Sequence, residues 1–162
     1  MLSARIGVVL TLACWWFLAG VQRTLPLPEF HLSDGWRWGG GAVFLSDAIF
    51  TLLWSHTVLV AAQEKNVLAT TGPFAYLRHP IYGAILWSGT AAVAFMTSSW
   101  MVLLGAAPLS ILWTMIAQSE EGDLRERFGE EFEAYAARTG QLFPSLSRFT
   151  ETAAKNNHNS HD

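Results

Sequence analysis

Four apolar runs divide the first 117 residues of the chain. A helix that crosses a bilayer needs about 20 mostly apolar residues, with a range of about 17–25. The runs reach this length when their flanking residues are included. A cleaved signal peptide would explain the first run alone, but three more runs follow it. The pattern therefore predicts transmembrane helices near 4–24, 39–62, 81–97 and 100–117.

The connections between these runs differ in composition. The segment from Leu25 to Gly41 ends in three consecutive glycines and predicts a turn-rich loop. Only Thr97, Ser98 and Ser99 separate the third and fourth runs, so these two helices should form a tight hairpin. Pro108 lies inside the fourth run and should kink it, because proline lacks an N–H group and clashes with the preceding turn.

The pattern changes after the fourth run, where the chain becomes strongly acidic. Leu124, Phe128, Phe132 and Tyr135 recur at spacings of four, four and three residues. This period places the four side chains on one face of an amphipathic helix near 118–138.

The expected fold class is all-α, an integral-membrane helical bundle with about four transmembrane helices and a C-terminal amphipathic cytoplasmic helix. Residues 1–150 should form a single membrane domain, since the length suits one domain. Residues 151–162 are polar, and we expect them to form a disordered tail.

Composition narrows the classes of function. Hydrophobic residues make up 51% of the chain and charged residues only 14%, whereas soluble domains carry about 25% charged residues. The net charge of −3 and the lack of a basic stripe predict no nucleic-acid partner. Cys14 is the single cysteine, which excludes an intrachain disulfide and a thiolate cluster, and no metal site is expected.

The distribution of Lys and Arg predicts the orientation. Four spans place both termini and the loop between the second and third spans on one side, which holds eight of the ten Lys and Arg residues. These residues favour the cytoplasmic side. We expect a multi-pass protein of the cell (inner) membrane, surrounded by membrane lipids, with both termini in the cytoplasm.

Candidate chemistry begins just before the third span. Pro80 keeps His79 out of helical geometry and suits the first turn of a helix. Arg78 and His79 should therefore lie at a helix N-terminus, which attracts anionic groups. A juxtamembrane arginine anchor followed by a helix-starting proline is the alternative interpretation.

A second candidate feature follows the fourth span, where Glu120 and Glu121 are adjacent. The expected hairpin brings this pair opposite Arg78, His79 and Tyr82. Such a site offers donors for a carboxylate, acceptors for an amine, and aromatic surface. S-adenosylmethionine carries matching groups, although other zwitterionic ligands would also fit, and Glu120 and Glu121 alone could be a solvated helix start.

Two segments together carry a resemblance to a known family. Thr71 to Tyr82 reads TGPFAYLRHPIY, and Glu120-Glu121 is followed by FGEEF, which ends at Phe132, and by Tyr135. These motifs resemble the signature of the isoprenylcysteine carboxyl methyltransferases and their phospholipid-methyltransferase relatives. The resemblance covers about half of the chain, and the first two spans carry no diagnostic motif.

The resemblance implies S-adenosylmethionine-dependent methyl transfer to a lipophilic small-molecule or lipid acceptor at the cytoplasmic membrane face. It implies catalytic roles for Glu120 and Arg78. The residues that it implies for the cofactor are Gln63, Asn66, Val67, Leu68, Ala69, Phe74, His79, Pro80, Ile81, Tyr82, Glu120 and Glu121.

One departure concerns the acceptor. The prenylcysteine-methylating branch carries an arginine one turn before Glu120, where this chain has Ile116. We expect Ile116 to share the acceptor-facing side of the helix with Glu120, which favours a more apolar or neutral acceptor. The pattern leaves open the accepting atom, the oligomeric state and the roles of Asp47 and His56 in the second span.

Two other functions stay open at this point. Some sterol reductases end in a similar His-Pro-x-Tyr hairpin, so a membrane NADPH-dependent reductase is the alternative enzyme. A noncatalytic membrane scaffold is a third interpretation, which the retained Glu pair and the intact Arg78 to Tyr82 motif disfavour.

Overall fold

The structure is a computed structural model that describes residues 2–25, 29 and 31–145. The predicted tail at 151–162 lies outside the described residues. The described residues form helices and connecting turns, with two isolated β-bridges and no β-strand. The elements are α1 (Leu2–Thr24), α2 (Asp34–Glu64), η1 (Gly72–Ala75), α3 (Pro80–Gly83), η2 (Ala84–Gly89), α4 (Thr90–Thr97), α5 (Trp100–Leu104), α6 (Ala106–Phe128) and α7 (Glu130–Ala136).

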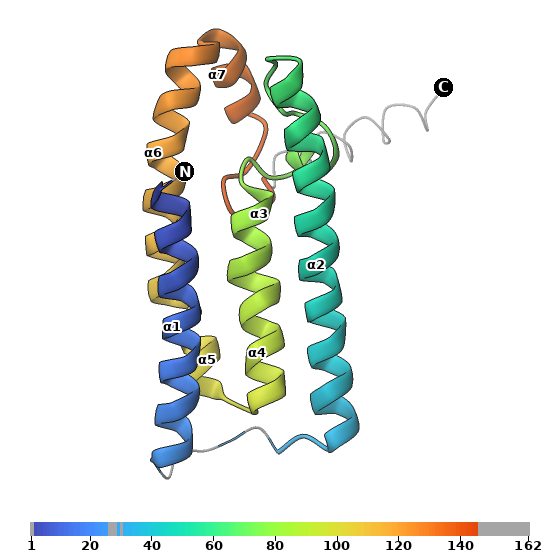
Figure 1. The fold of residues 1–162 in the computed structure, drawn as a ribbon, viewed down its shortest axis with the longest axis vertical. Coiled ribbons are helices and arrows are strands. Elements are labelled where there is room, and N and C mark those ends of the chain that lie inside the picture. The colour runs from blue at the N-terminus through green and yellow to red at the C-terminus, as the bar shows by residue number, and fades with distance from the viewer. Residues whose placement is uncertain (1, 26–28, 30, 146–162) are drawn as a thin grey trace, which may run out of the picture.

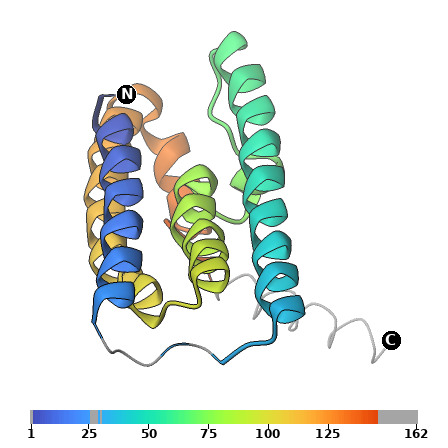
Figure 2. The same cartoon turned by 60° about the horizontal axis from the view of Figure 1, so that its bottom comes forward.

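Four rods, which alternate in direction along the chain, make up the bundle (Figure 1). The third rod is α3, η2 and α4 in succession, and the fourth is α5 followed by α6. Helix α1 packs against α5 and α6, whereas α2 packs against η2 and α4. The third rod therefore lies between α1 and α2, as two views show (Figures 1 and 2).

The four rods confirm the predicted all-α membrane bundle. The stretches Ala4–Thr24, Asp34–Glu64, Pro80–Thr97 and Trp100–Phe128 are each long and apolar enough to cross a membrane. Large apolar side chains point outward, among them Trp16, Phe17 and Leu53. Lipid-facing helices show this arrangement, because hydrocarbon does not penalise exposed apolar surface as water does.

The second helix begins earlier than predicted. Gly39, Gly40 and Gly41 are helical, although their sequence predicts a loop. Tertiary packing overrides their weak helix propensity. A Cβ atom on Gly40 would lie 2.5 Å from the ring of Phe95, and one on Gly41 would lie 2.7 Å from Met96. Gly40 and Gly41 thus let α2 approach α4 closely.

The predicted hairpin between the third and fourth spans is confirmed. Ser98 adopts left-handed geometry with φ of 52°, and the side chain of Ser99 accepts a hydrogen bond from the Val102 N–H at 3.2 Å. The fourth rod is interrupted at Gly105, three residues before Pro108. This position agrees with the predicted kink, since Pro108 has no N–H to donate to the carbonyl one turn earlier.

Helix α1 forms a packed seam with α6. The Trp113 Nε1–H donates to Thr11 Oγ1 at 3.1 Å, and both side chains are fully buried. One turn away, a Cβ atom on Gly7 would lie 2.6 Å from Cδ1 of Ile116. Ile116 is buried in this hydrophobic core. The prediction that Ile116 lies on the acceptor-facing side is therefore wrong.

The prediction of a single amphipathic helix near 118–138 is also wrong. Helix α6 continues through the acidic segment to Phe128, and Gly129, with φ of 51°, reverses the chain into α7. Phe132 and Tyr135 of α7 are buried and pack with Leu124 and Phe128 of α6. The regularly spaced apolar residues therefore form a small core between α6 and α7, and not one face of a continuous helix.

The two ionisable residues of the second span lie apart, as their spacing predicts. Asp47 Oδ2 accepts a hydrogen bond from Ser88 Oγ at 2.5 Å, and Ser88 belongs to the π-helical segment η2. His56 is exposed on α2. A single dyad of Asp47 and His56 does not form.

Candidate active site

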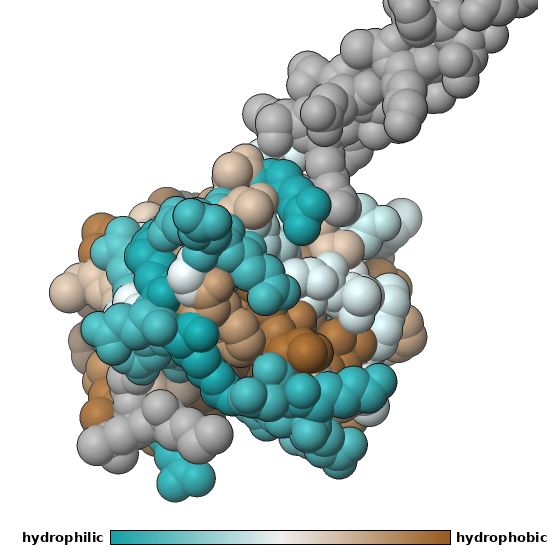
Figure 3. Space-filling view, turned by 90° about the horizontal axis from the view of Figure 1, so that it is seen from above, coloured by the Kyte–Doolittle hydropathy of each residue, from teal (hydrophilic) through white to brown (hydrophobic). Residues whose placement is uncertain are grey.

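A cavity of about 440 Å³ lies at the end of the bundle where α1 begins and α6 ends. Viewed onto this end, hydrophobic surface is framed by hydrophilic side chains (Figure 3). Elements far apart in the sequence form its walls. The lining residues are Ala4, Arg5, Leu59, Gln63, Phe74, Arg78, His79, Pro80, Ile81, Tyr82, Glu120, Asp123, Leu124 and Arg127.

Most of the predicted site residues lie at this one cavity. They come from α2, from the segment that precedes α3, from α3 itself and from α6. The predicted residues that line the cavity are Gln63, Phe74, Arg78, His79, Pro80, Ile81, Tyr82 and Glu120.

Local geometry holds the segment before α3 in place. His79 has φ of −124° and ψ of 64° and precedes Pro80, the first residue of α3, as predicted. The backbone N–H of Arg78 donates to Gly140 O at 2.8 Å, and that of His79 donates to Gln141 O at 3.1 Å. Hydrogen bonds to Gly140 and Gln141, in the stretch after α7, therefore hold the backbone of Arg78 and His79 in place.

Glu120 faces the cavity and is partly exposed. Its Oε1 accepts a hydrogen bond from Tyr82 Oη at 2.5 Å, and its Oε2 lies 3.8 Å from His79 Nδ1. The rings of His79 and Tyr82 stack at a centroid distance of 5.3 Å, and Tyr82 also packs on Trp113 at 4.6 Å. Aromatic contacts and the hydroxyl thus orient the Glu120 carboxylate.

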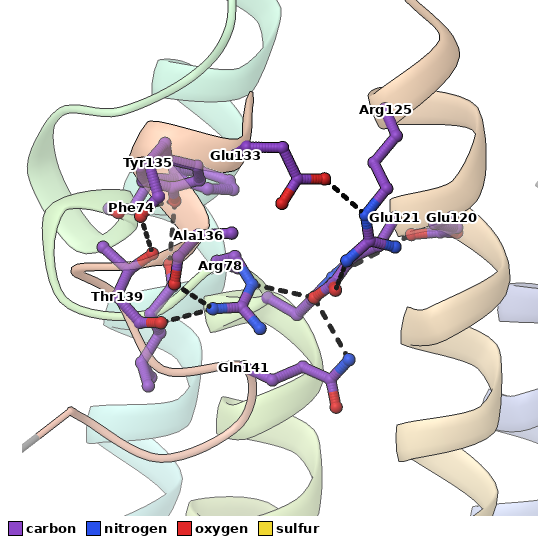
Figure 4. A network of polar contacts seen from close by, with 12 residues as sticks. Phe74, Arg78, Glu120, Glu121, Arg125, Glu133, Tyr135, Ala136, Thr139 and Gln141 are labelled. Carbon is purple, nitrogen blue, oxygen red and sulfur yellow. Dashed lines mark hydrogen bonds and ion pairs between the residues drawn. The ribbon is translucent and has the colours of Figure 1, made fainter. Parts of the chain in front are cut away.

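Glu121 points away from the cavity into a polar network (Figure 4). Its side chain is only 4% exposed. Glu121 Oε1 accepts from Arg78 Nε at 2.8 Å and from Gln141 Nε2 at 3.1 Å. Arg125 Nη2 lies 3.6 Å from Oε2. A buried carboxylate needs such compensation, because burial without partners is costly.

Arg78 joins this network to the chain after α7. Besides Glu121, its guanidinium donates to the carbonyl of Ala136 at 3.0 Å and to the carbonyl of Thr139 (Figure 4). His79 Nε2 is buried 3.3 Å from Glu121 Oε1 but forms no hydrogen bond of good geometry. Arg78 is thus largely committed to protein partners, and His79 Nε2 faces the Glu121 carboxylate behind the cavity.

A tyrosine anchors α7 to the loop before α3. Tyr135 Oη donates to Phe74 O at 2.7 Å, and the Tyr135 side chain is buried. Burial raises the pKa of the Tyr135 hydroxyl to about 12, although the charge of Arg78 opposes this rise. The hydroxyl therefore remains a donor at neutral pH.

Five of the predicted cofactor residues do not line this cavity. Val67, Leu68 and Ala69 line a second cavity of about 540 Å³ beside the end of α2, and Leu68 packs on the buried core of α7. Asn66 has φ of 54°, and its side chain accepts a hydrogen bond from Arg127, which lines the main cavity. Glu121 likewise lies behind the main cavity.

Six lining residues were not predicted as site residues. Asp123, Leu124 and Arg127 lie three, four and seven residues after Glu120, so helical periodicity would have placed them on the same face of α6. The other three carry no such signal, because they lie on α1 and α2 and reach the cavity only through packing. These are Ala4, Arg5 and Leu59.

The family follows from a match over more than half of the chain. Residues 37–131, which hold most of the cavity residues, match the model of the family described as phospholipid methyltransferase. The chain belongs to this family. The resemblance stated from the motifs is confirmed.

Three curated relatives share a similar region. The chain is 32% identical over 98 residues to the nickel-cobalt-cadmium resistance protein NccN of Alcaligenes xylosoxydans xylosoxydans, covering 60% of the chain and 45% of the relative. It is 31% identical over 110 residues to the cobalt-zinc-cadmium resistance protein CzcN of Cupriavidus metallidurans, covering 67% and 50%. It is 29% identical over 93 residues to protein-S-isoprenylcysteine O-methyltransferase of Dictyostelium discoideum, covering 57% and 39%.

The chain thus spans half or less of the length of these relatives. Among the described residues, no group of three or more His, Cys, Asp and Glu side chains is placed to hold a metal ion.

Proposed function

We propose that this protein transfers a methyl group from S-adenosylmethionine to a lipophilic acceptor at the membrane surface. The observation that carries the proposal is that residues of both family motifs line the same cavity. The motif that ends at Tyr82 and the one that begins at Glu120 meet through a hydrogen bond of 2.5 Å. The family match supports the same reaction class.

The residues of the cavity fit this cofactor. Its volume of about 440 Å³ lies within the usual range for ligand pockets, about 300–1,000 Å³. Glu120 and Asp123 provide carboxylates for an amine or a sulfonium, and Phe74 and Tyr82 provide aromatic surface. His79 also lines the cavity, and its Nδ1 lies 3.8 Å from Glu120 Oε2.

When bound, the cofactor supplies an electrophilic methyl group on a positively charged sulfur. A lone pair of the acceptor forms the new bond to the methyl carbon, and the electron pair of the breaking C–S bond returns to sulfur. A proton released by a neutral acceptor can pass to water or to Glu120. In such a displacement the protein mainly aligns the reactants and excludes water.

We assign Glu120 to direct contact with the bound cofactor and acceptor. Tyr82 positions Glu120 through its hydroxyl. Arg78 lines the cavity, but its donors bind Glu121 and two backbone carbonyls. We therefore assign Arg78 a positioning role, in place of the catalytic role that the motif suggests.

We further propose that the cavity opens toward the cytoplasm and that the protein resides in the inner membrane. The excess of Lys and Arg at this end supports that orientation. A labelling test uses the Cys14→Ala background with single cysteines at Gly35 or Glu126, which lie at opposite ends of the bundle. An impermeant reagent applied to intact cells should label position 35 only, and labelling of position 126 alone would contradict the orientation.

Calorimetry on detergent-purified protein tests the cofactor assignment. S-adenosylhomocysteine should bind and NADPH should not, and labelled methyl groups should appear in a membrane-lipid extract. Binding of NADPH without binding of S-adenosylhomocysteine would instead support the alternative reductase, which the family match does not favour.

A further inference from the structure

Three arginines line the cavity, and two of them are engaged. Arg78 binds Glu121 and two carbonyls. Arg127 donates to Asn66 and lies 5.2 Å from the ring centroid of Phe128. Arg5 is exposed, and among the described residues no hydrogen bond or ion pair to it is found. Of the three arginines that line the cavity, Arg5 is thus the one whose guanidinium has no partner among the described residues and can bind a ligand.

The packing of α1 on α6 determines which residues of α6 lie level with Arg5. Thr11 contacts Trp113, and Gly7 lies against Ile116. Because the two helices are antiparallel, each step back along α1 moves forward along α6. The start of α1 therefore lies beside the turn that carries Glu120, and Arg5 and Glu120 line the same cavity.

Arg5 also stands where the cavity meets the lipid-facing surface. Its neighbours Ile6, Val9 and Leu10 on α1 are exposed apolar side chains. The third rod separates α1 from α2, and both helices contribute to the cavity wall. A long basic side chain at such a boundary can keep its apolar stem in the hydrocarbon and its charge at the polar surface.

We propose that Arg5 determines acceptor specificity by binding an anionic group, a carboxylate or a phosphate, of an amphiphilic acceptor. The proposal rests on the proposed function. A guanidinium pairs with either group through two parallel hydrogen bonds. Glu120 and Asp123, on the α6 wall, suit the cationic parts of the cofactor and leave Arg5 to the acceptor. The identity of Ile116 carries no information about the acceptor, because Ile116 is buried in the α1–α6 seam.

Equilibrium binding in a neutral detergent tests Arg5 without turnover. The probes are dodecanoate, dodecyl phosphate and uncharged dodecanol, and the variants are Arg5→Gln, Arg5→Lys and the control Arg23→Gln. Arg23 lies in the last turn of the same helix, at the opposite end of the bundle. Arg5→Gln should weaken the anionic probe that suits the site at least about 10-fold, as expected for a lost charged hydrogen bond.

The same variant should leave the affinities for dodecanol and S-adenosylhomocysteine unchanged. Arg5→Lys, which keeps the charge but loses the paired donors, should give an intermediate affinity, and Arg23→Gln should match the wild type. The stronger of the two anionic probes identifies the head group. Methyl incorporation into a prenylcysteine carboxylate and into phosphatidylethanolamine then separates the two acceptor sources.

Three results would overturn the role of Arg5. They are equal affinity of wild type and Arg5→Gln for both anionic probes, no preference of the wild type for anionic over neutral probes, and a loss confined to S-adenosylhomocysteine. The last result would assign Arg5 to the cofactor. If anionic probes bind through Arg5 but no acceptor is methylated, the proposed function fails and the anion site stands.

Discussion

Glu120 and Glu121 are neighbours in the sequence, yet they belong to two different regions of the molecule. Glu120 borders the cavity with a side chain that is 31% exposed. Glu121 lies in the packed region behind the cavity, with 4% exposure and partners from three segments of the chain. Adjacent residues on a helix point about 100° apart, so one carboxylate can serve a ligand while the other holds the fold.

This difference suggests how the site can be both polar and stable. In the packed region the polar side chains bind other parts of the protein. At the cavity, the Glu120 carboxylate is partly exposed and can contact a ligand. Substitutions in the packed region should therefore change stability first, whereas substitutions at the cavity should change binding first.

The largest effect is expected for Ile116→Arg. Ile116 is buried against Gly7 and the core around Trp113, so the new charge would have no partner and no space. Burying an unpaired charge is among the most destabilising changes, and we expect a loss of about 4 kcal/mol or more. Thermal unfolding in detergent measures it. A stable variant with altered acceptor preference would restore the original view that Ile116 faces the acceptor.

Arg78→Ala should destabilise the protein by about 3 kcal/mol, because it removes the closest cation from the buried Glu121 carboxylate. The change also removes donors to the carbonyls of Ala136 and Thr139. Denaturant unfolding measures the loss, and the exposed Glu126→Ala on α6 serves as the control, with an expected change within about 0.5 kcal/mol. Wild-type stability of Arg78→Ala would show that the network does not hold the fold.

Glu120→Gln should leave stability unchanged and weaken cofactor binding about 10-fold, because the amide keeps the shape but loses the charge. Tyr82→Phe should have a smaller effect of the same kind, since its hydroxyl only orients Glu120. Calorimetry with S-adenosylhomocysteine measures both. Unchanged affinity in Glu120→Gln would remove Glu120 from the cofactor site.

The smallest effect is expected for Tyr135→Phe, which loses one hydrogen bond to Phe74 O and should cost about 1 kcal/mol at neutral pH. The pKa of Tyr135 is raised to about 12 in the folded protein, from an unfolded value of about 10. The unfolded chain then binds fewer protons between these values, so the stability of the wild type should fall as pH rises through this window.

Comparison of the two pH profiles isolates this contribution. Tyr135→Phe should lack the part of the alkaline loss that Tyr135 causes, while other titrating groups affect both proteins alike. Parallel profiles from pH 9 to pH 12 would show that Tyr135 does not couple to folding.

The sequence by itself determined the membrane class, the four spans and the motifs that meet at the cavity. Hydrophobic length reports spans because hydrocarbon tolerates few polar groups, whatever the neighbouring helices are. The short hairpin around Ser98 and the helix start at Pro80 are equally local, since backbone sterics define them. The meeting of Tyr82 and Glu120 follows from that hairpin.

Other features depended on the tertiary structure. Gly40 and Gly41 lie inside α2, where their lack of side chains lets the helix pack against Phe95 and Met96. The reversal at Gly129 turns one predicted amphipathic face into a two-helix core.

The direction of each side chain was likewise decided by distant partners. Ile116 is buried because α1 covers it, Glu121 because the stretch after α7 reaches it, and Arg5 lines the cavity because α1 packs beside α6. Sequence spacing establishes which residues share a helix face, but the neighbour that this face meets depends on packing between segments that no local pattern relates.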